Sequence, residues 1–131
     1  MNHGNVSVEI AKGLKVLKER IAAAKIPPSK IDESLNIATW NIREFGKQER
    51  TTAAIHYIAE VLGQFDLIGV VELRDDLTDL ARVLDVLGPT WRAVYSDMIP
   101  DAGGNRERIA MMEHSANQSK QKYFQRRRDA S

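Results

Sequence analysis

The sequence predicts an α/β protein built around a strand–helix–strand unit, and two observations support this class. Two short apolar segments, 35–42 and 66–72, have the length and composition of buried strands. Apolar residues at helical spacing lie between them, over 55–62. A helix between two buried strands is typical of a parallel pair joined by a right-handed crossover.

Further helices are predicted on either side of this unit. Apolar residues recur at steps of three and four over 6–24, with Asn5 or Ser7 as the N-cap, and a Pro-Pro pair ends this helix. A second apolar stripe over 77–87 predicts another helix, which a Gly-Pro pair closes.

The segment that follows predicts a hairpin over 91–112. Residues 91–96 alternate loosely between apolar and polar side chains, which suggests a strand. A glycine-containing turn covers 101–105, and 108–112 begins a further strand.

This pattern divides the chain into a helical extension over 1–30, an α/β domain over 31–112 and a polar tail over 113–131. The tail carries five Lys or Arg against two Asp or Glu, and its large apolar residues are Tyr123 and Phe124. So little apolar surface cannot offset the entropy lost on ordering, and we therefore expect a disordered basic tail, with a weak surface helix as the alternative.

The composition excludes several kinds of site. The chain has no cysteine, which excludes disulfides, thiolate zinc sites and a cysteine nucleophile. No apolar run reaches the roughly 18 residues of a membrane span. The first residues lack the basic start and apolar stretch of a signal peptide, so a cytoplasmic location is the default expectation.

Polar side chains follow both strands of the central unit. Asn41 lies near the end of the first strand, and Glu72 lies near the end of the second. Open α/β sheets bind ligands at this edge, and oxygen ligands of these types suit Mg²⁺, Mn²⁺ or Ca²⁺ rather than zinc. Spacing alone leaves the ordinary alternative open, in which Asn41 is a turn residue and Glu72 a carboxylate on the approach to a helix.

Two arginines, Arg43 and Arg74, follow the same strand ends. A guanidinium can hold a phosphate oxygen pair through two parallel hydrogen bonds. Ion pairs with the neighbouring carboxylates of Glu44, Asp75 or Asp76 are the alternative. The three histidines are weaker candidates for catalysis, because none has the sequence context of a catalytic dyad. We expect His3 to lie in a frayed terminus, His56 on the surface and His114 in the polar tail.

Three motifs in this order resemble the endonuclease/exonuclease/phosphatase superfamily, which has a deoxyribonuclease-like fold. They are Leu-Asn-Ile-Ala-Thr-Trp-Asn-Ile-Arg at 35–43, Val-Glu-Leu-Arg-Asp at 71–75, and Gly-Asn-Arg-Glu-Arg-Ile-Ala at 104–110. The resemblance covers about 30–112 and implies the βαβ-containing half of a two-sheet α/β sandwich.

The resemblance also implies roles for four residues. Asn41 becomes a catalytic amide near metal and phosphate, Glu72 becomes the metal-binding carboxylate, and Arg74 contacts the substrate phosphate. Glu107 becomes the carboxylate that orients a catalytic histidine. The implied reaction is attack of an activated water on a phosphodiester or phosphomonoester, assisted by Mg²⁺, Mn²⁺ or Ca²⁺, with the nuclease branch favoured and DNA a possible substrate.

The chain departs from the family pattern after residue 112. Family members continue for about as many residues again and supply a catalytic histidine, an Asp-x-Asn motif and an Asp-His pair. Neither the Asp-x-Asn motif nor the Asp-His pair occurs in this sequence. His114 follows Glu107 too soon to fill the histidine role. We therefore expect a truncated family member, which is inactive on its own, and whether the chain is an enzyme stays open.

Two alternatives remain from the sequence. The chain could be a non-catalytic module that binds nucleic acid or protein, for instance through the basic tail. It could also be one half of a split enzyme, with the missing C-terminal half supplied as a separate chain.

Overall fold

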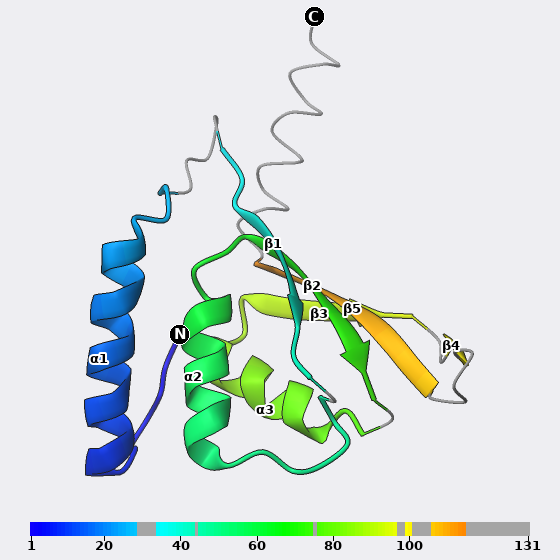
Figure 1. Ribbon diagram of the computed structural model, residues 1–131, viewed down its shortest axis with the longest axis horizontal. Coiled ribbons are helices and arrows are strands. Elements are labelled where there is room, and N and C mark those ends of the chain that lie inside the picture. Colours follow the sequence, from blue (N-terminus) through cyan, green and yellow to red (C-terminus); the bar gives the residue numbers. More distant parts are fainter. Residues whose placement is uncertain (29–33, 44, 75, 97–98, 101–105, 115–131) are drawn as a thin grey trace, which may run out of the picture.

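The computed structural model describes residues 1–28, 34–43, 45–74, 76–96, 99–100 and 106–114. The elements within these ranges are, in chain order, α1 (Val8–Ala24), β1 (Ile37–Asn41), α2 (Thr52–Leu62), β2 (Leu67–Leu73), α3 (Thr78–Leu87), β3 (Trp91–Tyr95), β4 (Ile99–Pro100) and β5 (Arg106–His114). The strands form one sheet in the order β1-β2-β5-β3, with β4 paired to β5. The predicted α/β class and its N-terminal helix are confirmed (Figure 1).

The predicted strand–helix–strand unit is also confirmed. Strands β1 and β2 pair in parallel, from Ile37 opposite Leu67 to Asn41 opposite Val71, and α2 connects them. Strand β5 runs antiparallel to both β2 and β3, so the sheet is mixed and the predicted hairpin over 91–112 is present.

Strand β5 extends beyond the hairpin that the sequence predicts. It continues through Glu113 and His114, which pair with β2 and β3, whereas we expected the polar tail to begin there. Backbone groups form these ladders whatever the polarity of the side chains, so the loss of apolar residues did not mark the strand end. The remainder of the predicted tail, 115–131, lies outside the described residues, and the three-part division remains a prediction.

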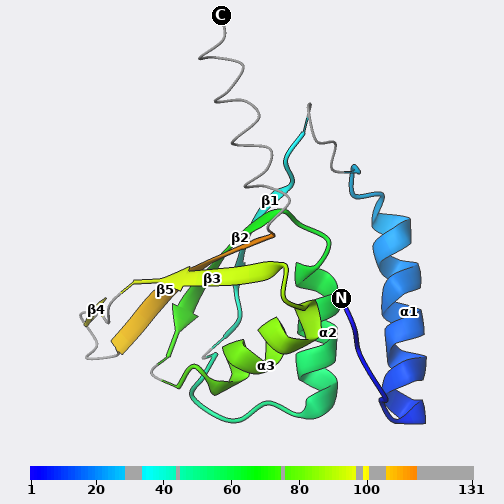
Figure 2. The same cartoon turned by 180° about the vertical axis from the view of Figure 1, so that it is seen from behind.

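The hydrophobic core lies between the sheet and the helices α2 and α3, while α1 packs on the far side of α2 (Figures 1 and 2). Ile68, Val70 and Leu73 of β2 and Ala110 and Met112 of β5 supply fully buried core residues from the sheet. Burial of each large apolar side chain stabilises the fold by roughly 1.5–3 kcal/mol.

Alternate residues of the strands face away from the helices. Ile37, Val94, Ile109 and Met111 remain exposed, at 62%, 62%, 47% and 40% of their surface. No described helix covers this side of the sheet (Figure 2). Together these side chains expose a larger apolar area than the single, scattered apolar residues that are common on protein surfaces.

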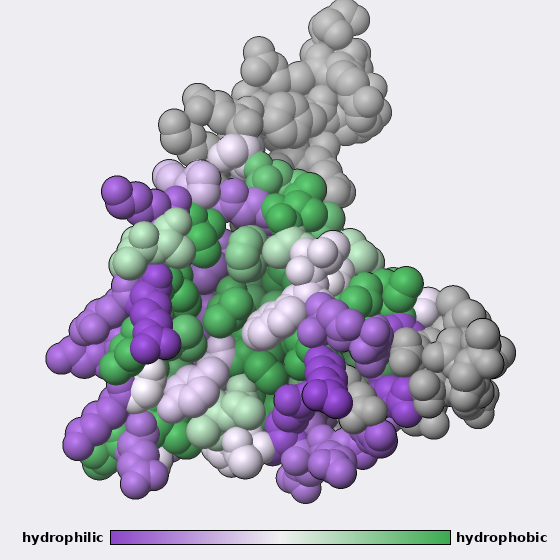
Figure 3. Space-filling model, in the orientation of Figure 1, coloured by the Kyte–Doolittle hydropathy of each residue, from purple (hydrophilic) through white to green (hydrophobic). Residues whose placement is uncertain are grey.

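Helix α1 begins where the sequence predicts. The side chain of Ser7 accepts a hydrogen bond from the backbone N–H of Ile10 at 3.2 Å, and the helix ends at Lys25, which has a left-handed conformation. An apolar groove of about 590 Å³ lies between α1, α2 and β1. Figure 3 shows the apolar side chains gathered there, bordered by the hydrophilic outer face of α1.

The N-terminal segment packs against α2 and α3, and our expectations for two histidines were wrong. His3 Nδ1 lies 2.9 Å from His56 Nδ1, and His3 Nε2 lies 2.6 Å from the carboxylate of Glu60. His56 and Glu60 are buried, and the N–H of Asn2 donates to the carbonyl of Val86 at 2.9 Å. The His3–His56–Glu60 cluster therefore holds the terminus that we expected to fray.

This cluster makes stability depend on pH. Burial, followed by the charges of His3 and Arg82, lowers the pKa of His56 below its ordinary 6.5. The unfolded chain then binds this proton at a higher pH than the folded chain does. The contribution to stability is complete above pH 6.5 and is lost as the pH falls through the lowered pKa.

We expect the urea midpoint to fall between pH 7.5 and pH 5 in the wild-type chain, and to fall less in His56→Gln, which has no proton to take up. His3→Gln, which leaves His56 in place, controls for loss of the contact itself and should also reduce the slope by removing one neighbouring charge. Equal pH slopes in all three proteins contradict the assignment.

Candidate functional site

Strand β2 contains a bulge near its end. The cross-strand pairs on either side of the irregularity are Val70 with Ala110 and Leu73 with Arg108. Two residues, Val71 and Glu72, therefore oppose the single residue Ile109. The extra residue shifts the alternation of side chains, so Leu73 returns to the core side and is fully buried.

The bulge holds Glu72 in an unfavourable backbone conformation. Its φ is +58°, in the left-handed region, and among the described residues Lys25 is the other non-glycine residue with positive φ. Lys25 ends a helix, where this conformation is common, but Glu72 lies inside a strand. Such strain costs about 1–3 kcal/mol and concentrates at functional sites. A carboxylate at this position is therefore a candidate for function.

Asn41 and Glu72 lie at the same edge of the sheet. Asn41 is the last residue of β1 and pairs in register with Val71, the residue before Glu72. The Asn41 side chain is exposed and that of Glu72 is partly exposed, so both are accessible from solvent. The spacing argument from the sequence predicted this common edge.

The loops that follow the two strands are joined. The backbone N–H of Arg74 donates to the carbonyl of Phe45 at 2.7 Å, which ties the end of β2 to the loop after β1. At Gly46, where φ is +92°, a Cβ would lie 2.2 Å from the carbonyl oxygen of Asp76. Only glycine permits this approach, so Gly46 keeps Arg43 and Arg74 on loops that meet.

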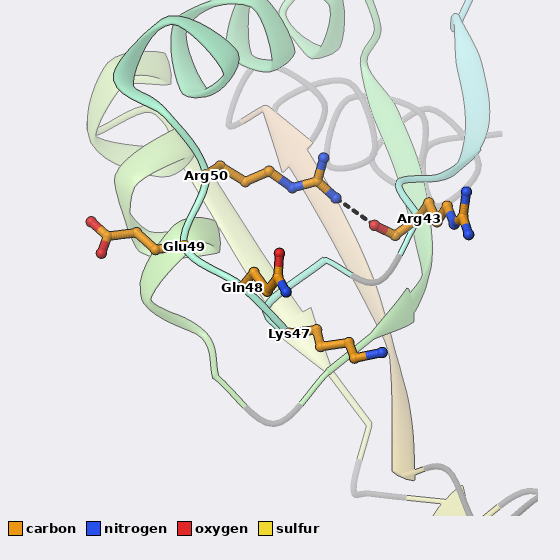
Figure 4. Close-up of a pocket in the computed structure, with 5 residues that line it drawn as sticks. All are labelled: Arg43, Lys47, Gln48, Glu49 and Arg50. Carbon is orange, nitrogen blue, oxygen red and sulfur yellow. Dashed lines mark hydrogen bonds between the residues drawn. The ribbon is translucent and has the colours of Figure 1, made fainter.

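A pocket of about 270 Å³ opens in the loop between β1 and α2, and its lining residues are Arg43, Lys47, Gln48, Glu49 and Arg50. Figure 4 shows the Glu49 carboxylate directed away from the other side chains. The pocket is therefore basic. Arg43 was predicted from the sequence, whereas Lys47 and Arg50 were not, although three cations within eight residues after a strand were a usable signal.

Strand β5 runs antiparallel to β2, so the first residues of β5 lie beside the carboxyl end of β2 and its last residues lie beside the amino end of β2. Its first residues, including Glu107, are at the edge that contains Glu72; the Glu107 side chain lies outside the described part. His114 is at the other edge, where its N–H donates to the carbonyl of Asp66 and its ring contacts Trp91. His114 therefore cannot act at the edge that carries Asn41.

Within the described ranges, no group of three or more His, Asp or Glu side chains is arranged so that it could hold a metal ion. Asn41 and Glu72 together offer one amide and one carboxylate oxygen ligand group. Mg²⁺ commonly binds through one or two carboxylates and keeps several waters, so this donor set fits it.

Among the described helices, none is long and apolar enough to cross a membrane.

Comparison with known proteins shows a partial relationship to deoxyribonuclease I. The chain is 35% identical to human deoxyribonuclease-1 over 95 residues, which is 71% of this chain and 33% of the human protein. It is 37% identical to rabbit deoxyribonuclease-1 over 70 residues, which is 49% of this chain and 25% of that protein. The chain thus spans about a third or less of these relatives. No family model matches it.

Inside a strand an alanine variant is usually more stable than a glycine variant, and the strain at Glu72 predicts the reverse order at this position. Glu72→Gly should be more stable than Glu72→Ala by about 1 kcal/mol, because glycine adopts a positive φ without steric cost. Urea unfolding followed by circular dichroism measures the difference.

The neighbouring residue provides the control. At Val71, whose φ is not positive, the alanine variant should be the more stable one by about 0.5–1 kcal/mol. If alanine is also favoured at Glu72, the left-handed conformation does not exist in solution.

Proposed function

We propose that the edge formed by Asn41, Glu72 and Arg74 is part of a metal-assisted phosphodiesterase site of the nuclease type. The observation that carries the proposal is the strained, partly exposed Glu72, held by a bulge beside Asn41 at the carboxyl edge of two parallel strands. The partial similarity to deoxyribonuclease-1 supports the chemical class. It covers a third or less of those proteins, so the substrate remains part of the proposal.

Glu72 and Asn41 are the residues that would hold a divalent cation, with Mg²⁺ preferred and Mn²⁺ or Ca²⁺ as substitutes. Bound there, the cation would offset negative charge that develops on the phosphate during hydrolysis. The bulge contributes by fixing the backbone from which the Glu72 side chain extends, so that no backbone ordering is needed on binding. Asn41 adds a neutral oxygen ligand from the neighbouring strand.

The arginines would bind the phosphate. A guanidinium presents several N–H donors in a plane and pairs with two phosphate oxygens at once. The backbone of Arg74 is anchored to Phe45, and Arg43 follows β1 directly, so both side chains start from fixed points on the same edge. They would position the ester bond beside Asn41 and Glu72.

Turnover also requires a group that moves a proton. Two of the three histidines, His3 and His56, are bound to each other near α2, and His114 lies at the far edge of the sheet. Glu107 is proposed to orient a histidine, and none of these three histidines lies at the end of the sheet where the Glu107 backbone is. We therefore propose that this polypeptide binds metal and phosphate without efficient hydrolysis.

The metal site can be tested by paramagnetic NMR. Mn²⁺ should broaden the amide signals of residues 41–43 and 71–74 before others, and Mg²⁺ should reverse the effect. Glu72→Gln removes the single charged ligand and should weaken Mn²⁺ binding by about tenfold or more. Glu19→Gln, which changes an exposed carboxylate on α1, is the matched control and should bind normally.

Equal broadening in Glu72→Gln and the wild type would exclude a cation site at this edge. The absence of turnover is tested separately, with supercoiled plasmid DNA and Mg²⁺. We expect the wild-type chain to leave the DNA uncut, as Glu72→Gln does. Efficient cleavage that depends on Glu72 would show that the chain supplies its own proton-transfer group.

A further inference from the structure

The loop between β1 and α2 carries a second candidate binding site beside the proposed one. We call it the basic pocket: the cavity of about 270 Å³ whose cationic lining residues are Arg43, Lys47 and Arg50. Lys47 and Arg50 bring two cations to this cavity, and Arg43 lines it with a guanidinium that Figure 4 shows directed away from Arg50. Glu49, the carboxylate of the lining, is 84% exposed and directed outward, so the cavity attracts an anion. The pocket therefore has the charge and size of an anion site.

The side chain of Arg50 is fixed within this pocket. Its guanidinium donates a hydrogen bond to the carbonyl of Arg43 and lies 5.9 Å from the ring centroid of Phe45. Phe45 is almost fully buried, so the ring is itself held in place. A guanidinium carries five N–H donors, and the contact with Arg43 uses one of its nitrogens. The remaining donors start from a defined position.

Helix α3 fixes the backbone of the same residue. Asp79, which is 3% exposed, accepts a hydrogen bond from the N–H of Arg50 at 3.0 Å. Arg82 donates to the carbonyl of Arg50 at 2.8 Å and to Asp79 at 2.9 Å. Both backbone groups of Arg50 are thus bound by the ion pair between the buried Asp79 and the partly exposed Arg82. The cost of ordering the loop is met during folding and not on binding.

The basic pocket adjoins the edge of the sheet. Arg43, which lines the pocket, follows Asn41 by two residues, and the carbonyl of Phe45 binds the N–H of Arg74. A protein that binds one phosphate needs one cationic site. Two anion sites joined through one loop fit a ligand with more than one phosphate and not a phosphomonoester, and the nuclease-type function proposed above makes that ligand a nucleic-acid strand.

We propose that the basic pocket binds a phosphate next to the one held at the sheet edge, on the same nucleic-acid strand. Lys47 and Arg50 contact this phosphate, and Asp79 acts through Arg50 as a positioning residue. The identity of the first phosphate rests on the proposed function above. The binding of a strand by the pocket can be measured without metal and is therefore tested separately.

The test is fluorescence anisotropy with a labelled twelve-nucleotide single strand, in EDTA and over a range of salt concentrations. The Lys47→Gln/Arg50→Gln double variant should bind about tenfold more weakly, and the slope of log affinity against log salt should decrease by about 0.7, the value of one lost phosphate contact on a single strand. Single-stranded DNA and RNA of one sequence distinguish the two sources of this backbone.

The matched control is Lys15→Gln/Lys18→Gln, which removes the same charge from exposed positions on α1. It should leave affinity and salt slope close to those of the wild type. Equal losses in the two double variants would mean non-specific attraction and overturn the proposal, as would an unchanged slope in Lys47→Gln/Arg50→Gln. Because Arg50 also supports the loop, Lys47→Gln alone is measured too, and it should lose affinity with an unchanged urea midpoint.

Asp79→Asn tests the positioning role. It keeps every cation of the basic pocket but weakens the attachment of Arg50 to α3. We expect lower affinity for the strand with an unchanged salt slope, because the number of phosphate contacts stays the same. A fall in slope equal to that of Lys47→Gln/Arg50→Gln, or full wild-type affinity, would contradict the role.

The two proposals can fail independently. Normal Mn²⁺ binding at Glu72 together with unchanged strand binding in Lys47→Gln/Arg50→Gln overturns the basic pocket alone. Loss of strand binding in that variant, without any Mn²⁺ site at Glu72, overturns the metal-assisted function and leaves a strand-binding pocket.

Discussion

The parallel pairing of β1 with β2 is the constraint on which the other features depend. Parallel neighbours must be joined by a crossover, and α2 provides it while covering the core side of the sheet. The same pairing brings the carboxyl ends of both strands to one edge. Asn41, Glu72 and the two following arginines therefore lie at the same end of the sheet without a long-range contact being specified for each of them. The bulge then adjusts one residue of this edge, Glu72, without disturbing the core.

The sequence was sufficient to predict the elements that this pairing requires, because each is marked by a local pattern. Apolar runs identified β1 and β2, and the spacing of Ile55, Ile58 and Leu62 identified α2. The common edge of Asn41 and Glu72 followed from topology alone. The chemical roles proposed for these residues rest instead on the resemblance of three motifs.

The features that were missed depend on contacts between distant residues. The bulge at Glu72 exists because β5 pairs with β2, with residues 35 to 40 positions apart on either side of it (Leu73 with Arg108, Val70 with Ala110), and no local pattern specifies that register. The His3–His56 contact joins residues 53 apart, so the helical pattern of α2 marked its apolar stripe but could not supply the partner of His56. Arg50 was passed over for the same reason, since its importance comes from Asp79 on another helix.

The loop between β1 and α2 is attached on two sides, to β2 through Phe45 and to α3 through Asp79. It thereby bridges the sheet and the helical layer. An anion held by this loop should suppress local opening of α3 as well as of the loop, because binding to the native state alone lowers the population of opened states. Slower amide hydrogen exchange in a helix with no contact to the ligand would be the signature of this bridge. In this small domain, ligand occupancy and the cohesion of its two layers are thus parts of one equilibrium.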